Sequence, residues 1–303
     1  MLLVEWMSEM KINTPPIFVA IVIVVISGCN DENIHKEKNK LASQVAGSMI
    51  TVEGGRYQMG DFGTLIGEKL PFSPDSDNKP LHWVYLNDFK MTKHRITWGE
   101  FNLWLHLTNK GASEYYKKIS NRKIEGKYDE RMLKYIGDEY PAVANWADAS
   151  SFCSWVGGVL GTEVSLPTEA QWEYVARSRG KFRQFANSDN IYDLSIPDLK
   201  LNFTHDISPV GTFPPNPLGF YDMMGNGHDW VNDWYAKDYY QYSPEKDPQG
   251  PVSGTEKVVR GYLGSMFGLY DISRGSNKPE TEAPGFGFRC VENSPKNKNS
   301  PKL

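Results

Sequence analysis

Thiols are the side chains in this sequence with the greatest capacity for metal and redox chemistry, and the chain has only three, Cys29, Cys153 and Cys290. Two thiolates that lie a few residues apart can hold a soft ion such as Cu(I). No two of the three cysteines are close to one another along the chain. Their spacing therefore predicts no local thiolate pair for copper.

The histidines offer no close pair either, and zinc or non-haem iron sites usually have one. One alternative stays open: a redox metal bound by residues distant in the sequence, namely His205, His228 and Asp229. The same Asp229, together with Asn226, could instead stabilise turns by hydrogen bonds to the nearby backbone.

Cys29 has a different chemistry, which its surroundings indicate. Residues 17–26 are an apolar run preceded by Lys11, too short for a membrane-spanning helix of about 20 residues and typical of a signal peptide. The run ends in Ile-Ser-Gly-Cys, which resembles the lipobox of bacterial lipoproteins. We therefore expect residues 1–28, with the true start at Met10, to be a signal peptide and Cys29 to be lipidated.

The flanking segments are polar. Residues 29–46 follow Cys29 and are expected to be a flexible tether, and residues 294–303 a disordered tail. The residue after Cys29 is Asn30 rather than aspartate, which favours the outer membrane over the inner membrane as the site of a periplasm-facing lipoprotein. The formal net charge of −4 and pI near 5.9 argue against a nucleic-acid partner.

Residues 47–293 are expected to form one folded domain, and abundant aromatic residues, glycine and proline favour a loop-rich α+β fold. Period-two alternation around Gly54-Gly55 predicts a hairpin within residues 49–59. A further strand is expected over residues 83–89.

Three helices follow in the predicted domain. Thr97 and Glu100 form a capping-box pattern at the start of the first, and Thr168 and Gln171 form the same pattern at the start of the third. The second helix is expected over residues 146–160.

Four blocks of sequence then point to a family. They occur in a fixed order over some 240 residues: Leu-Pro-Thr-Glu-Ala-Gln-Trp-Glu-Tyr-Val-Ala-Arg at 166–177, the Gly-Asn-Gly-His-Asp-Trp segment within 209–230, Val-Arg-Gly at 259–261 and Gly-Phe-Gly-Phe-Arg-Cys at 285–290. Together they resemble the formylglycine-generating enzyme, or sulfatase-modifying factor, family. The resemblance implies a single domain of C-type-lectin-like topology with little regular secondary structure.

The resemblance also implies copper- and oxygen-dependent oxidation of a sulfatase cysteine, but the sequence departs from the family where that chemistry resides. The family's two copper-binding cysteines follow an Arg-Gly-Gly-Ser-type segment, and residues 260–274 contain no cysteine. We therefore expect that copper is not bound. Cys153 and Cys290 match the positions of a structural disulfide in catalytic members.

Calcium is the cofactor that the resemblance favours. The family's loop supplies backbone carbonyls and an acidic side chain, and the matching positions here are Met224, Gly225, Gly227 and Asp229. A second site would correspond to the three residues Asn202, Phe203 and Asp206.

By the same resemblance, the substrate groove of the enzymes is expected to become a binding groove. Its predicted residues are Trp234, Tyr235, Tyr262, Ser265, Met266, Phe267 and Tyr270.

The function expected from these features is a non-catalytic envelope lipoprotein that binds a protein, peptide or other ligand. A periplasmic immunity protein and an accessory subunit of an envelope machine both fit. The alternatives are a metal-dependent oxidoreductase with an atypical site and a lectin-like ligand receptor.

Overall fold

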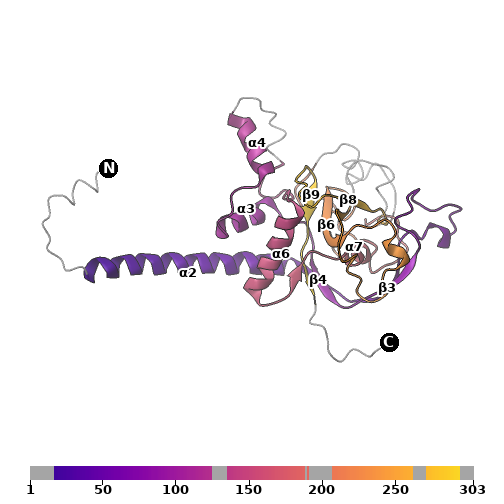
Figure 1. Ribbon diagram of the computed structural model, residues 1–303, viewed down its shortest axis with the longest axis horizontal. Coiled ribbons are helices and arrows are strands. Elements are labelled where there is room, and N and C mark those ends of the chain that lie inside the picture. Colours follow the sequence, from indigo (N-terminus) through magenta and orange to yellow (C-terminus); the bar gives the residue numbers. More distant parts are fainter. Residues whose placement is uncertain (1–16, 125–134, 188–189, 191–206, 262–270, 294–303) are drawn as a thin grey trace.

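The chain folds as a single α+β domain with modest helix and strand content, as predicted (Figure 1). The computed structural model describes residues 17–124, 135–187, 190, 207–261 and 271–293, and only the backbone of residues 17–31 and 122–124. The helices are α2 (Ile17–Gly47), α3 (Trp98–Leu107), α4 (Glu114–Ile124), α6 (Trp146–Leu160) and α7 (Glu169–Ala176), with 3₁₀ turns η1 (Gly63–Leu65) and η2 (Tyr239–Gln241). The strands are β1 (Met49–Val52), β2 (Gly55–Met59), β3 (His82–Leu86), β4 (Phe89–Thr92), β5 (Val164–Ser165), β6 (His228–Trp234), β7 (Lys257–Arg260), β8 (Gly275–Asn277), β9 (Phe286–Phe288) and β10 (Val291–Asn293).

The described strands form three small sheets with the orders β1-β4-β10-β5, β2-β3 and β8-β7-β6-β9. All pairings are antiparallel except that of β6 with β9. Strand β4 pairs with both the first strand β1 and the last strand β10, and strand β6 places the segment 228–234 in the middle of its sheet. Asp229 and Trp234, two of the predicted site residues, therefore lie on a strand that is held by β7 and β9, which are distant from it in the sequence.

The predicted hairpin over residues 49–59 is wrong, although both of its strands exist. Strand β1 pairs with β4, and β2 pairs with β3. The Gly-Gly pair instead lets the chain cross closely over another backbone, because a Cβ on Gly54 would lie 2.2 Å from the carbonyl oxygen of Leu86. The backbone N–H of Gly54 also donates to the side chain of Asp88.

The predicted helix starts are confirmed. Thr97 caps α3 in a complete capping box with Glu100, and Thr168 caps α7 in the same way with Gln171. Helix α6 spans residues 146–160 as predicted. These signals depend on residues three positions apart, so the local sequence suffices to specify them.

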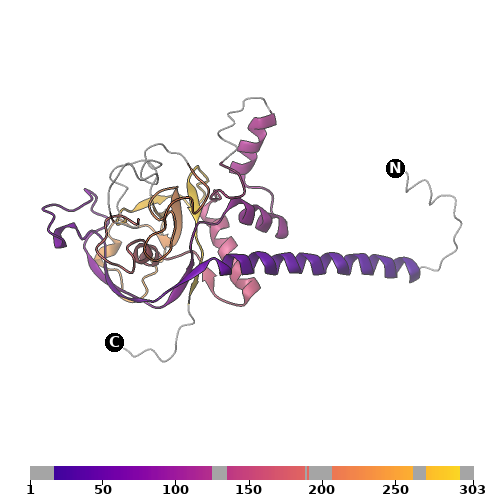
Figure 2. The same ribbon diagram turned by 180° about the vertical axis from the view of Figure 1, so that it is seen from behind.

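Residues 29–46 differ from the flexible tether expected of them, because they lie within the continuous helix α2 (Figures 1 and 2). Leu41, Ala42 and Val45 are buried in the main hydrophobic cluster with residues of α3 and α6. Their spacing places them on one face of a helix, and burial of that face stabilises the helix where it meets the domain. The N-terminal half of α2 extends away from the domain.

Among the described residues, no helix offers an apolar stretch of the length that a bilayer crossing needs. The predicted signal peptide lies partly outside the described residues, the side chain of Cys29 is not described, and the predicted tail 294–303 lies wholly outside.

The disulfide that the resemblance implies is present. Cys153 of α6 and Cys290, between β9 and β10, are joined with an S–S distance of 1.97 Å. Both cysteines are fully buried in the cluster that also contains Phe152 and Phe288. Because the bond closes a loop across 137 positions of sequence, it restricts the unfolded chain and stabilises the fold by roughly 2–5 kcal/mol.

Candidate functional site

The loop before strand β6 carries the residues predicted to bind calcium. Asn226 has a φ of 54° and Gly227 a φ of 115°. Glycine is needed at 227, because a Cβ there would lie 2.5 Å from the carbonyl oxygen of Gly285. This backbone directs consecutive carbonyl groups of the loop toward one point.

That point is filled by the guanidinium group of Arg95. Its Nη1 donates to the carbonyl oxygens of Gly225 and Asn226 at 3.0 and 3.1 Å, and its Nη2 donates to that of Gly227 at 2.9 Å. Its Nε and Nη2 also donate to the two carboxylate oxygens of Asp229, at 3.0 and 3.2 Å. The side chains of Arg95 and Asp229 are completely buried.

Arg95 reaches the loop because its own backbone is fixed and its stem has room. The next residue, Ile96, donates its N–H to Phe288 and accepts one from Ala142. The side-chain stem passes over Gly287, where a Cβ would lie 3.0 Å from the Cδ of Arg95. A larger residue at 287 would therefore have to displace the arginine.

Two further groups bind Asp229. Arg289 Nε donates to its Oδ2 at 3.1 Å, and Trp172 Nε1 donates to the same atom at 3.0 Å. Burial alone would raise the pKa of Asp229, but the charges of Arg95 and Arg289 and these hydrogen bonds outweigh it and lower the pKa below its usual value. Asp229 is therefore ionised at neutral pH.

These residues do not fit a calcium ion. Calcium takes six to eight oxygen ligands, and the carbonyls of Gly225 and Gly227 and both oxygens of Asp229 already accept hydrogen bonds from Arg95. A divalent ion at that point would overlap a guanidinium group and be repelled by it. Met224, the remaining predicted ligand, is buried beside this loop.

His228 is partly buried and neutral at physiological pH. Burial and the charge of Arg95 lower its pKa to about 4. Its Nδ1 lies 2.8 Å from the carbonyl oxygen of Gly261, and its ring stacks on Phe286. Among the described residues there is no group of three or more His, Cys, Asp or Glu side chains that could hold a metal ion.

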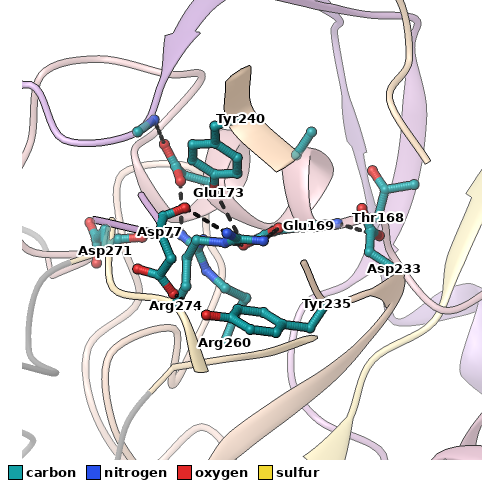
Figure 3. A network of polar contacts seen from close by, with 12 residues as sticks. Asp77, Thr168, Glu169, Glu173, Asp233, Tyr235, Tyr240, Arg260, Asp271 and Arg274 are labelled. Carbon is teal, nitrogen blue, oxygen red and sulfur yellow. Dashed lines mark hydrogen bonds and ion pairs between the residues drawn. The ribbon is translucent and has the colours of Figure 1, made fainter. Parts of the chain in front are cut away.

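A second buried ionic cluster surrounds helix α7, and Tyr235, one of the predicted groove residues, lies beside it (Figure 3). Glu169 of α7 accepts two hydrogen bonds from Arg274, at 2.7 and 2.9 Å, and one from Arg260, at 2.8 Å. One turn later on α7, Glu173 binds Arg260 at 2.9 Å and Arg177 at 2.7 Å. A single short helix therefore fixes three arginines.

Two acids near this cluster are shifted in the opposite direction to Asp229. Burial and, next, the charge of Glu169 raise the pKa of Asp233 to about 7. Burial also raises the pKa of Asp271 well above its usual value. In contrast to the loop before β6, this cluster contains a carboxyl group, that of Asp233, which titrates near neutral pH.

The two described aromatic residues of the predicted groove already have partners within the chain. Trp234 stacks on Trp146, and the ammonium group of Lys257 lies 3.8 Å from the ring centre of Trp234 and 3.9 Å from that of Trp146. The hydroxyl of Tyr235 donates to Asp77 at 3.0 Å. Both rings therefore contribute to the fold, whatever else they bind.

The remaining predicted site residues lie outside the described part of the chain. They are Asn202, Phe203 and Asp206 of the second calcium site, and Tyr262, Ser265, Met266, Phe267 and Tyr270 of the groove.

Sequence reasoning missed Arg95, the residue that organises the loop before β6. A signal was present: Arg95 lies between an apolar alternating strand and a capped helix, where a short connection must be buried. The sequence could not show which carbonyls it meets, because they lie 130 to 132 positions away.

The chain is similar in sequence or in structure to several known proteins. The chain is 29% identical over 270 residues to the serine/threonine-protein kinase pkn1 of Chlamydia caviae, which covers 86% of this chain but 40% of that protein. The chain thus spans less than half the length of this relative. The structure of PvdO from Pseudomonas aeruginosa matches with a TM-score of 0.60 at 23% identity, covering 81% of this chain and 94% of that one, which shows a shared fold.

Two further relatives are equally similar to the chain, but one is named as an enzyme and the other as inactive. The formylglycine-generating enzyme of Streptomyces coelicolor is 28% identical and covers 81% of this chain and 89% of its own length. The inactive C-alpha-formylglycine-generating enzyme 2 of Bos taurus is also 28% identical, covering 80% and 87%. Identity alone therefore does not separate an enzyme from an inactive protein.

The match to the family itself covers most of the chain. Residues 35–294 correspond to the sulfatase-modifying factor enzyme 1-like domain, and members of that family commonly bind calcium. The capped helix α7, the loop before β6 and the disulfide all lie within this range. The chain belongs to the formylglycine-generating, or sulfatase-modifying factor, family.

Proposed function

We propose that the chain is a non-catalytic binding module that holds a protein or peptide partner in the bacterial cell envelope. The observation that carries this proposal is that the chain has no cysteines available for a pair of copper ligands. Cys153 and Cys290 are joined to one another, and Cys29 is the only other cysteine in the sequence. A copper site with two thiolates near residues 260–274 has no residues from which to form.

The anchoring of the predicted groove supports a binding role. Arg260 and Arg274 lie immediately on either side of the segment 261–273, and both bind the same carboxylate, Glu169. The two ends of the segment are therefore fixed to helix α7 by buried, charge-assisted hydrogen bonds. Residues between them can differ in type without loss of the contacts that hold the ends.

Crosslinking in the envelopes of the chain's own host, followed by affinity purification and mass spectrometry, tests the binding role. We expect one stoichiometric protein partner for the full chain. A variant with Tyr262→Ala and Tyr270→Ala should lose it, and Tyr242→Ala should retain it, because Tyr242 is an exposed aromatic residue outside the segment. Retention of the partner by the double variant would contradict the assignment of the groove.

A direct assay tests the absence of catalysis. The full chain is incubated with copper, oxygen and a cysteine-containing sulfatase peptide, and the peptide is analysed by mass spectrometry. We expect the cysteine to remain a thiol. Its conversion to formylglycine would overturn the proposal, and so would a stoichiometric redox metal retained in elemental analysis of the purified chain.

The membrane attachment is part of the same proposal. We infer that Cys29 carries the lipid and that the protein faces the periplasm, on the outer membrane rather than the inner membrane. Metabolic labelling with an alkyne fatty acid should mark the chain but not the Cys29→Ser variant. Label on that variant would contradict lipidation at Cys29, and fractionation with the inner membrane would contradict the assigned membrane.

A further inference from the structure

The loop before β6 needs a positive group, whatever the protein binds. Carbonyl oxygens of Gly225, Asn226 and Gly227 converge there with the carboxylate of Asp229, and all of them are buried. Buried oxygens directed at one point repel one another unless a cation or a set of donors lies between them. Within the family, calcium is the ion expected at such a loop.

We propose that the guanidinium group of Arg95 is the permanent cation of this loop and that the loop therefore forms without calcium. The inference is independent of the proposed binding function, because it concerns what holds the loop and not what the groove binds.

The hydrogen-bond geometry supports this assignment. Arg95 makes five hydrogen bonds to the loop, from 2.9 to 3.2 Å, and four of them end on oxygens of the predicted calcium ligands Gly225, Gly227 and Asp229. A guanidinium group is planar, always charged and a donor on all three nitrogens. It can therefore satisfy several carbonyls and one carboxylate together, as a bound cation does.

The charge balance leads to the same conclusion. Asp229 already binds two guanidinium groups, those of Arg95 and Arg289. A divalent cation at the loop would lie in a low-dielectric interior beside two positive charges and would have only one carboxylate as an anionic ligand. Like charges this close disfavour binding strongly, so occupation by calcium would require expulsion of Arg95.

Calcium binding and thermal stability of the wild-type chain give the first test. After removal of metal ions, the change in Tm between EGTA and about 1 mM CaCl₂, a concentration at or above the dissociation constants of weak extracellular calcium modules, should be the same in the wild type and in Asp229→Asn. Isothermal titration with CaCl₂ should show no stoichiometric site dependent on Asp229. A Tm that rises by several degrees with calcium, and no longer does so in Asp229→Asn, would overturn the proposal.

Luminescent Tb³⁺, a calcium substitute, gives a second comparison of the wild type with Asp229→Asn, made at a temperature at which both are folded. Trp172 donates to Asp229 and lies where it would sensitise a bound ion. We expect no Tb³⁺ emission that differs between the wild type and Asp229→Asn. Emission present only in the wild type would show that an ion displaces Arg95.

Variants at position 95 separate the effect of the positive charge of Arg95 on stability from the effect of its side-chain volume. Arg95→Ala should melt well below the wild type, and calcium should raise its Tm, because the carbonyl oxygens of the loop and Oδ1 of Asp229 have then lost the donor that Arg95 supplied. Arg95→Lys keeps one positive charge with fewer donors, and we expect an intermediate Tm that calcium does not raise. If calcium raised the Tm of both variants and of the wild type equally, the guanidinium group would not be the cation of the loop.

Discussion

Two buried ionic clusters lie in this domain, and they are built from the same residue types to different effect. Around Asp229, two arginines and a tryptophan donate to one carboxylate, and the pKa of that carboxylate is lowered. Around Glu169, the arginines likewise lower the pKa of the carboxyl group that they bind. Next to Glu169, however, Asp233 has a pKa raised to about 7.

The difference follows from the number of cations available to each acid. Arg95 directs its whole guanidinium group at Asp229 and the adjacent carbonyls, so that acid has a dedicated partner. Asp233 accepts the backbone N–H of Glu169 and lies close to the negative charge of that residue. One cluster is thus fixed at all physiological pH values, and the other contains a group that titrates.

The largest effect is expected from Asp229→Asn. The change leaves two buried guanidinium groups facing a neutral amide, and removal of one partner of a buried pair costs about 3–5 kcal/mol. Urea unfolding measures the loss in the free energy of unfolding. Glu245→Gln is the matched control, because its pair with Arg56 is about half exposed and such pairs contribute about 1 kcal/mol or less. Similar losses in the two variants would contradict the comparison.

The contribution of Asp233 to the pH dependence of stability is the next effect in size. Its pKa in the folded state is about 7, whereas an aspartate in the unfolded chain has a pKa of about 3.9. The folded chain therefore binds more protons in this window, and the free energy of unfolding falls as the pH rises from about 4 to about 7.

Asp233→Asn tests this effect, because an asparagine can still accept the N–H of Glu169 but does not titrate. Urea unfolding of both proteins across the window gives the difference directly. We expect the wild type to lose up to a few kcal/mol relative to the variant as the pH rises. Parallel pH profiles would show that Asp233 does not titrate there.

The smallest effect is expected from Lys257→Met. The change removes a cation that lies between the rings of Trp146 and Trp234 and leaves the carbonyl of Asn232 without that donor. We expect a loss of about 1–2 kcal/mol in the free energy of unfolding. The charge of Lys257 lowers the pKa of Asp233. The variant should therefore raise that pKa and move the fall in the free energy of unfolding to higher pH. An unchanged pH profile would separate Lys257 from the second cluster.

The sequence was most informative where structure depends on neighbouring residues. The capping residues Thr97 and Thr168 and the bounds of the helix at 146–160 could be predicted, because each depends on residues within a few positions. The α+β class followed from the composition and from the resemblance, and the disulfide followed from the resemblance alone.

The errors occurred where one local pattern suits two structures. Gly54-Gly55 fits a hairpin turn, but it also fits a close crossing over the backbone of Leu86. The polar residues after Cys29 suit a tether, yet Leu41, Ala42 and Val45 are enough to hold a helix on the domain. Only tertiary contacts decide between such possibilities.

The helix α2 changes what a lipid on Cys29 would do mechanically. A disordered tether with the same number of residues would let the domain rotate freely and vary its distance from the membrane over a broad range. The helix instead runs unbroken from Cys29 to Gly47, a length of about 27 Å at 1.5 Å per residue, and ends in the hydrophobic core. With Cys29 lipidated, α2 would be a rigid spacer. It would fix the distance of the domain from the membrane surface and the orientation in which the groove meets its partner.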